Sequence, residues 1–112
     1  MTFKQLRRLC ISLPEVEELE TWGDTTFRVR GKIFVISSPD GDTASIKASL
    51  DDQSGLVAME PETFSVAAYT GRYGWVRVRL AGLSGELADR LIRNAWRRTA
   101  PKRLVAKLEK TR

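Results

Sequence analysis

Basic and apolar side chains alternate in two short stretches, Phe27-Arg28-Val29-Arg30 and Val76-Arg77-Val78-Arg79. Alternate residues of a strand point to opposite faces, so each stretch predicts an apolar inward face and a basic outward face. Lys47 follows Ile46 in the same manner, and Trp75 is in phase with Arg77. Cationic groups beside an aromatic ring are suited to the phosphates and bases of nucleic acid.

The alternation defines a candidate nucleic-acid interface. The dipeptide Gly31-Lys32 is a hairpin signal that would place Lys32 at the tip of a wing. If the two Arg-rich strands are neighbours, their four guanidinium groups face one backbone, because adjacent strands lie about 4.8 Å apart. The same pattern also fits a solvated strand face, with Trp75 in a small second core. The candidate residues are Arg28, Arg30, Lys32, Lys47, Trp75, Arg77 and Arg79.

The positive charge is concentrated at the C-terminal end. Residues 90–112 hold nine Lys or Arg residues and one acid, so this segment carries +8, whereas residues 1–89 carry −3. A solvated helix face and a site for an anionic partner both fit this distribution. The secondary candidate patch is Arg97, Arg98, Lys102 and Arg103.

The residue types give little support for catalysis. The chain has no histidine and a single cysteine, which removes most nucleophilic, general-base and transition-metal designs. Cys10 falls on the apolar stripe of a predicted helix and is expected to be a core residue. We therefore expect a non-catalytic protein with no cofactor, no metal site and no small-molecule substrate.

Five acids, Glu15, Glu17, Glu18, Glu20 and Asp24, occur without a basic residue between them. Their oxygens could bind a hard cation, although the spacing of an EF-hand loop is absent. A solvated acidic strand is the simpler interpretation.

Bulk properties favour one domain spanning residues 1–112. The longest apolar run, residues 33–36, is far too short to cross a bilayer, which takes roughly 20 residues. The N-terminus lacks an apolar signal segment, and one cysteine cannot form an internal disulfide. We expect a cytoplasmic protein without a membrane association.

Periodicity predicts an α+β fold. Apolar residues recur at helical spacing over residues 3–13 and from 87 to 96, the latter including Trp96 and following the N-cap candidate Ser84. Asp51-Asp52 can cap a short helix, and Pro101 begins a last one. Strands are expected near 26–30, 33–37, 43–48 and 75–80, and the segment 64–73 is turn-rich. The prediction is an antiparallel sheet of four to six strands with N- and C-terminal helices on one face.

The order of several motifs resembles the MmcQ/YjbR family over roughly residues 3–108. The matching segments are Trp22-Gly23 with 27–34, Ile46-Lys47, 61–64 leading through Tyr69 and Gly71 to 74–80, 91–97, and 100–104. The resemblance implies a small bacterial protein with a fold similar to that of the frataxin-like CyaY group. Family members are commonly described as DNA-binding, with a winged contact surface. Many carry a histidine where this chain has Tyr69, so no role of that imidazole carries over.

The expected function is backbone-directed binding of nucleic acid, with DNA as the expected partner and little sequence specificity. Two alternatives remain open at this point. One is a protein-interaction or regulatory module that uses the sheet face around Trp75. The other is cation handling by the acidic segment 15–24, by analogy with frataxin-like proteins.

Overall fold

Small hydroxyl side chains set the helix starts. In the computed structural model, which describes residues 1–110, the Thr2 hydroxyl accepts a hydrogen bond from the Gln5 N–H and caps α1 (Phe3–Ile11). Ser49 caps α2 (Leu50–Met59) and Ser84 caps α3 (Gly85–Thr99) in the same way. Each cap satisfies an N–H that lacks a partner within the helix, which fixes where the helix begins.

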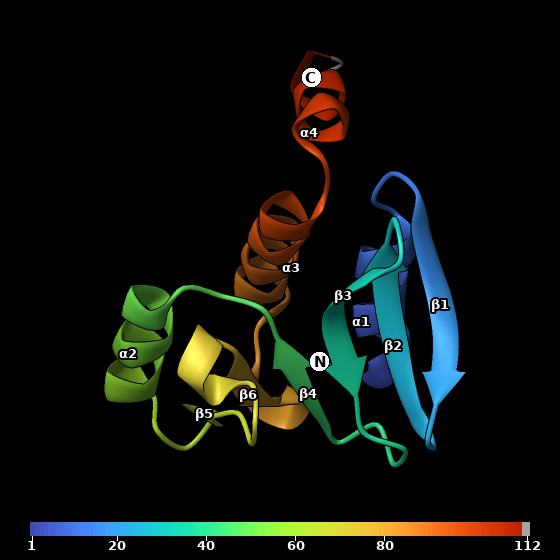
Figure 1. Cartoon of the computed structure of the whole chain (residues 1–112). Coiled ribbons are helices and arrows are strands. Elements are labelled where there is room, and N and C mark those ends of the chain that lie inside the picture. The colour runs from blue at the N-terminus through green and yellow to red at the C-terminus, as the bar shows by residue number, and fades with distance from the viewer. Residues whose placement is uncertain (111–112) are drawn as a thin grey trace.

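Six strands form one antiparallel sheet (Figure 1). Their order across the sheet is β1-β2-β3-β4-β6-β5, so the chain forms a meander as far as β4 and then adds the last two strands in reverse. The strands are β1 (Val16–Thr21), β2 (Asp24–Val29), β3 (Lys32–Ser37), β4 (Thr43–Ile46), β5 (Phe64–Val66) and β6 (Val76–Arg79). Two short 3-10 segments, η1 (Gly71–Tyr73) and η2 (Leu80–Gly82), flank β6, and α4 (Lys102–Lys110) closes the described chain.

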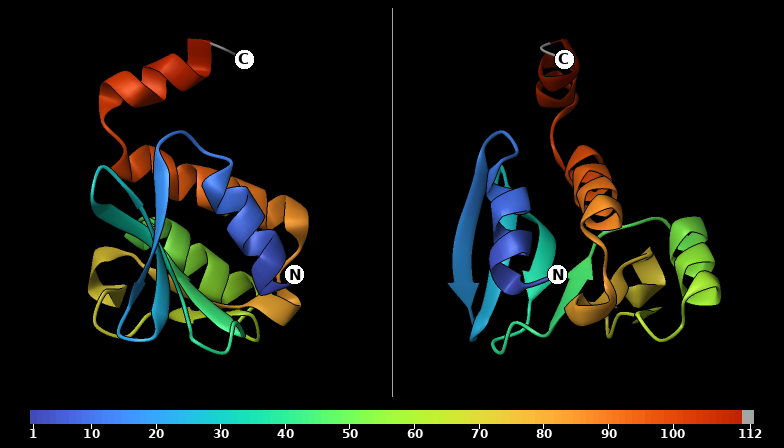
Figure 2. Two further views of the ribbon diagram at one scale, coloured as in Figure 1. Left: turned by 90° about the vertical axis from the view of Figure 1, so that its right-hand side faces the viewer. Right: turned by 180° about the vertical axis from the view of Figure 1, so that it is seen from behind.

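The main helices lie on one face of this sheet, which confirms the predicted α+β architecture. Helix α1 packs against α3 and β1, and α3 packs against β3 and β4. Figure 2 shows α1 and α3 on the same side of the strands, with α4 projecting beyond the end of α3. Helix α2 packs against β5 at the other end of the strand order.

The inward residues of the sheet and the stripes of α1 and α3 make the core. Phe27, Val29, Val76 and Val78 are fully buried, as the alternation predicted. Trp96 is also fully buried, and its ring N–H donates to the Pro14 carbonyl oxygen at 3.1 Å. The predictions that Trp96 and Cys10 are core residues are confirmed.

The opposite side of the sheet, facing away from α1 and α3, is called the open face below. Strand register aligns its outward residues in rows that run across the strands. One row is Leu19, Thr26, Ile36, Ser45, Arg77 and Ser65, and the next contains Thr43 and Arg79. No helix among residues 1–110 packs over Arg77 and Arg79, and both are exposed.

Two local predictions were wrong by one or two residues. The β2–β3 turn consists of Arg30 and Gly31, not Gly31 and Lys32, because Val29 pairs with Lys32. Both turn residues have positive φ, 52° and 80°, as a type I′ turn requires, and glycine suits the second position. The cap of α2 is Ser49, not Asp51 or Asp52, which instead occupy the first helical turn.

Candidate nucleic-acid interface

Arg77 and Arg79 form the centre of the candidate interface. They are two residues apart on β6, so their side chains leave the same face about 6.6 Å apart. Both are exposed, and among residues 1–110 neither side chain forms an ion pair or a hydrogen bond. They line a shallow hollow of about 180 Å³ together with Thr43, Thr63, Ser65 and Glu62. Two guanidinium groups and three hydroxyl-bearing residues, which are possible donors to an oxyanion, therefore line the hollow beside the single carboxylate of Glu62.

The positive charge of Arg77 acts on the carboxylate of Asp40. The pKa of Asp40 is below its ordinary value, chiefly because the Ser38 hydroxyl donates to its carboxylate at 2.6 Å. The Asp42 backbone N–H and the positive charge of Arg77 lower it further. Asp40 makes its hydrogen bonds within its own turn, so the guanidinium of Arg77 stays open to another anion.

Lys47 extends the basic track of β6 by one row. It follows β4, and its backbone N–H donates to the Phe34 carbonyl, so it continues the outward alternation of Thr43 and Ser45. Continuing the β4–β6 register places Lys47 opposite Trp75, one outward row beyond Arg77. Lys47, Arg77 and Arg79 therefore follow one another along the β4–β6 half of the open face.

The structure separates the other predicted basic residues from this track. Strands β2 and β6 are not neighbours, because β3 and β4 lie between them. Arg28 and Arg77 are thus three strand spacings apart, roughly 14 Å, and the expected group of four adjacent guanidiniums does not form. Arg28 bonds to the hydroxyls of Thr26 and Thr21 at 3.2 and 3.0 Å, and its partner on β1 is Glu17.

Arg30 lies in the β2–β3 turn rather than on a strand face. Its guanidinium binds both carboxylate oxygens of Glu15, with Nη2 at 3.1 Å from Oε2. This bond holds the pKa of Glu15 below its ordinary value. Lys32 begins β3 beside the turn and is exposed. The predicted β2–β3 hairpin, called the wing here, is present, but Lys32 is not at its tip and the Arg30 guanidinium is paired with Glu15.

Trp75 is not on the surface. Its side chain is only 8% exposed, although it is outside the main apolar cluster of the sheet and helices. This burial corrects the prediction that its ring is available to stack or insert, and it agrees with the alternative of a small second core. The preceding Gly74 approaches Ala48 so closely that an added Cβ would lie 2.5 Å from the Ala48 oxygen.

Other aromatic residues occupy the exposed positions instead. Trp22 in the β1–β2 turn is 99% exposed, Tyr69 is 95% exposed and Tyr73 is 65% exposed. None of the three was predicted to be a binding residue. Trp22 precedes a glycine between two predicted strands, and Tyr69 and Tyr73 lie in the turn-rich segment, so a search for aromatic residues in turns would have found all three.

The secondary basic patch is distributed over α3 and α4. Arg97 is partly buried, and its Nε lies 3.8 Å from Glu109 Oε1 on α4. Arg98, Lys102 and Arg103 are exposed. Lys107 of α4 also lowers the pKa of Glu15, so the C-terminal helix approaches the β2–β3 wing. The patch is thus a surface separate from the Lys47, Arg77 and Arg79 track.

The acidic segment 15–24 forms β1 and its flanking turns. Glu15 binds Arg30, and Glu18 accepts a bond from Arg7 Nε at 2.6 Å. Within residues 1–110, no three acidic, histidine or cysteine side chains converge in a manner that could hold a metal ion. The pairing of these acids with arginines weighs against the cation-handling alternative.

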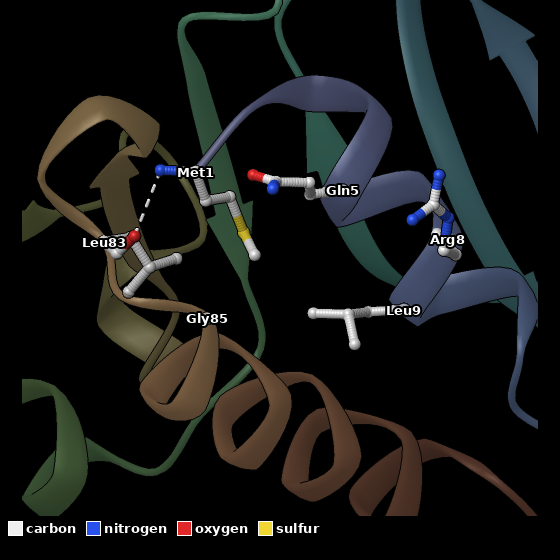
Figure 3. A pocket seen from close by; sticks show the side chains of 6 residues that line it. All are labelled: Met1, Gln5, Arg8, Leu9, Leu83 and Gly85. Carbon is white, nitrogen blue, oxygen red and sulfur yellow. Dashed lines mark hydrogen bonds between the residues drawn. The ribbon is translucent and has the colours of Figure 1, made fainter.

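A more apolar hollow lies on the helical side of the molecule. It has a volume of about 370 Å³, and Met1, Gln5, Arg8, Leu9, Leu83 and Gly85 line it. Figure 3 shows Met1 and Leu83 on one side of it and the α1 residues on the other. The thiol of Cys10 on α1 is fully buried, and burial raises its pKa, so it is not available as a nucleophile beside this hollow.

None of the helices in the described part of the chain is long and apolar enough to cross a membrane.

Comparison with known proteins identifies the fold and the family. The crystal structure of the Deinococcus radiodurans protein DR2400, with domain DUF419, superposes with a TM-score of 0.77 at 22% sequence identity. The match covers 85% of this chain and 75% of that one, and it shows a shared fold. No curated protein matches the chain. A sequence model of the YjbR family matches residues 11–98, which include the whole sheet and nearly all of α3. The chain therefore belongs to the YjbR family, as its motifs suggested.

Proposed function

We propose that this domain binds the phosphate backbone of DNA through the β4–β6 half of its open face, without catalysis. The observation that carries the proposal is the pair Arg77 and Arg79. Both guanidinium groups are exposed side by side, make no ion pair among residues 1–110, and line a hollow with three hydroxyl-bearing residues.

This arrangement is suited to phosphate for two reasons. A guanidinium presents a planar fork of donors that matches phosphate oxygens. Hydroxyl groups such as those of Thr43 and Ser65 are further donors to phosphate oxygens. Lys47 adds a third cation one row further along the same half of the face. Three cations in a line can follow successive phosphates of one strand.

The proposed contacts explain binding but not sequence recognition. Phosphate contacts fix position and orientation, whereas sequence is read at base edges in the grooves. No helix among residues 1–110 lies over Arg77 and Arg79, where it could enter a major groove, and Trp75 is buried. We expect similar affinity for duplexes of different sequence.

The test is the salt dependence of binding to a random duplex. Three phosphate contacts predict a slope of log affinity against log salt of roughly −2.7, at about −0.9 for each contact. The double variant Arg77→Glu/Arg79→Glu is expected to flatten that slope by about 1.8 and to weaken binding to all sequences alike. Its inward neighbours Val76 and Val78 are unchanged, so the fold is expected to survive.

A charge-matched control separates a local site from bulk charge. Lys102→Glu/Arg103→Glu alters net charge by the same amount in the C-terminal patch, away from β6. We expect this control to keep most of the wild-type slope. Absence of wild-type binding at low salt would refute the proposal. Loss of binding in the control with retention in the Arg77/Arg79 variant would move the site to α3 and α4.

A further inference from the structure

Two exposed tyrosines stand in the connection between β5 and β6, which is called the aromatic loop (residues 67–75). Tyr69 is 95% exposed with φ of +62°, a conformation that bulky residues rarely adopt. Tyr73 ends η1 and is 65% exposed. Two large aromatic rings thus lie in solvent within one short loop, one of them on strained backbone, and both can contact a ligand outside this chain.

The loop is held in place by buried polar contacts. The amide nitrogen of Gln53, a buried residue of α2, donates to the carbonyl oxygens of Gly71 and Trp75 at 2.8 and 2.6 Å. An added Cβ on Gly71 would lie 2.3 Å from a methyl carbon of Val66, so any side chain there would have to displace Val66. Because Gln53 and Val66 hold the base of the loop, a ligand that binds the tyrosines loses little free energy to ordering the loop.

The loop adjoins the proposed phosphate track. In Figures 1 and 2 the η1 segment, drawn in yellow, projects on the side of the sheet opposite α1. The alternation along β6 directs Arg77 and Arg79 to the same side, away from the core. Tyr73 is four residues from Arg77, so their Cα atoms are no more than about 14 Å apart. The Arg72 guanidinium lies over the Tyr73 ring, 4.8 Å from its centroid. The loop thus carries a cation of its own in contact with one of its two rings.

We propose that the aromatic loop is a base-stacking platform and that the preferred ligand of the open face is a single-stranded nucleic acid. This inference rests on the proposed function. Unpaired bases can lie on the rings of Tyr69 and Tyr73 while Lys47, Arg77 and Arg79 hold the backbone. Single-strand-binding proteins combine a cationic track with aromatic stacking in this way. In a duplex the bases are already stacked on one another, so the tyrosines gain no partner.

The cationic surroundings favour nucleic acid over an apolar protein partner. The described basic residues nearest to the loop along the chain are Arg72, Arg77 and Arg79, and Lys47 lies opposite Trp75. A polyanion with exposed π-faces complements both features of this surface. An acidic protein would satisfy the charge but would not require two rings.

The experiment compares three fluorescently labelled probes of equal length, about twelve nucleotides: oligothymidine, a fully abasic strand, and a duplex. We expect wild type to bind oligothymidine about tenfold or more tightly than the abasic strand. Tyr69→Ala/Tyr73→Ala is expected to remove this difference while leaving abasic-strand and duplex affinity unchanged. Tyr69→Phe/Tyr73→Phe is expected to retain it, because the rings remain.

Trp22→Ala is the matched control. Trp22 is an equally exposed aromatic residue with positive φ, but it belongs to the β1–β2 turn, at the opposite end of the strand order from β5 and β6. Its replacement is expected to leave all three affinities unchanged. Circular dichroism and thermal unfolding of each variant establish that the fold is intact.

The two proposals fail in different ways. If wild type binds none of the probes at low salt, the proposed function is wrong and the stacking platform falls with it. If wild type binds all three probes equally and the tyrosine variants match it, only the stacking platform is overturned. If tyrosine replacement lowers the affinity for all three probes alike, the loop makes backbone contacts and the stacking inference is likewise wrong.

Discussion

The chain contains the same alternation of apolar and basic residues twice, in Phe27-Arg28-Val29-Arg30 and in Val76-Arg77-Val78-Arg79. The two stretches differ in the bonding partners of their arginines. Their inward residues are equally buried. Their arginines differ, because Arg28 on β2 bonds to threonine hydroxyls and Arg30 in the β2–β3 turn binds Glu15, whereas Arg77 and Arg79 make neither kind of bond among residues 1–110. The neighbouring segments, not the pattern itself, decide whether such an arginine is bonded within the chain or available to a ligand.

The inward residues of both patterns are buried alike, and replacing one of them is expected to give the largest change in stability. Phe27→Ala empties a fully buried site and is expected to lower the free energy of unfolding by about 3–5 kcal/mol. Trp22→Ala, at a fully exposed ring, is expected to change it by no more than about 0.5 kcal/mol. Urea denaturation measures both. A small loss for Phe27→Ala would mean that the first pattern does not carry the core.

The loop that precedes the second pattern is held by Gln53, and replacing this residue tests how much that contact stabilises the loop. Gln53→Ala removes one of the two donors of each carbonyl, since Gly71 O also accepts from the Gly74 N–H and Trp75 O from the Ala67 N–H. Each lost hydrogen bond costs about 0.5–1.5 kcal/mol, so the loss of two is expected to lower the free energy of unfolding by about 1–3 kcal/mol in urea denaturation. Hydrogen exchange of amides 67–75 is expected to accelerate more than that of β2. Equal acceleration in both places would indicate a global rather than a local effect.

Removing the negative charge of Glu15 would leave Arg30 of the first pattern without its ion pair, as Arg77 and Arg79 of the second pattern are among residues 1–110. Glu15→Gln frees the Arg30 guanidinium, and we expect a rise in DNA affinity and a salt slope steeper by up to about 0.9. Glu20→Gln serves as the control, since Glu20 is an exposed acid of the same segment. Unchanged binding in Glu15→Gln would show that the β2–β3 wing does not approach the DNA.

The smallest effect concerns pH. The folded-state pKa of Glu15 is lowered by its bond to Arg30, so the pair stabilises the fold above the ordinary glutamate pKa, about 4.3. This contribution is lost as pH falls through the lower folded-state value. Because the pair is exposed, the effect is small. We expect wild type to melt at a slightly higher temperature than Glu15→Gln at pH 6. This difference is expected to shrink as the pH is lowered to 3, with most of the change at roughly pH 4 or below.

Local signals in the sequence predicted much of the fold but not the arrangement of the site. The alternation in 76–79 and the helical stripe ending at Trp96 depend on neighbours in sequence, and both were correct. Strand order depends on contacts between distant segments, so the separation of Arg28 from Arg77 could not be read from spacing. The same holds for Trp75, whose burial accompanies the close approach of Gly74 to Ala48.

Strand β1 has a consequence for how the molecule behaves in a crowded solution. It lies at one end of the sheet, where a row of backbone donors and acceptors has no strand of residues 1–110 beside it. Such an edge can pair with another chain and seed aggregation, and like charges along it discourage that pairing. Glu17 and Glu20 carry like charges along this edge, while the opposite edge, β5, is only three residues long. These two acids therefore oppose the pairing of β1 with β1 of a second copy.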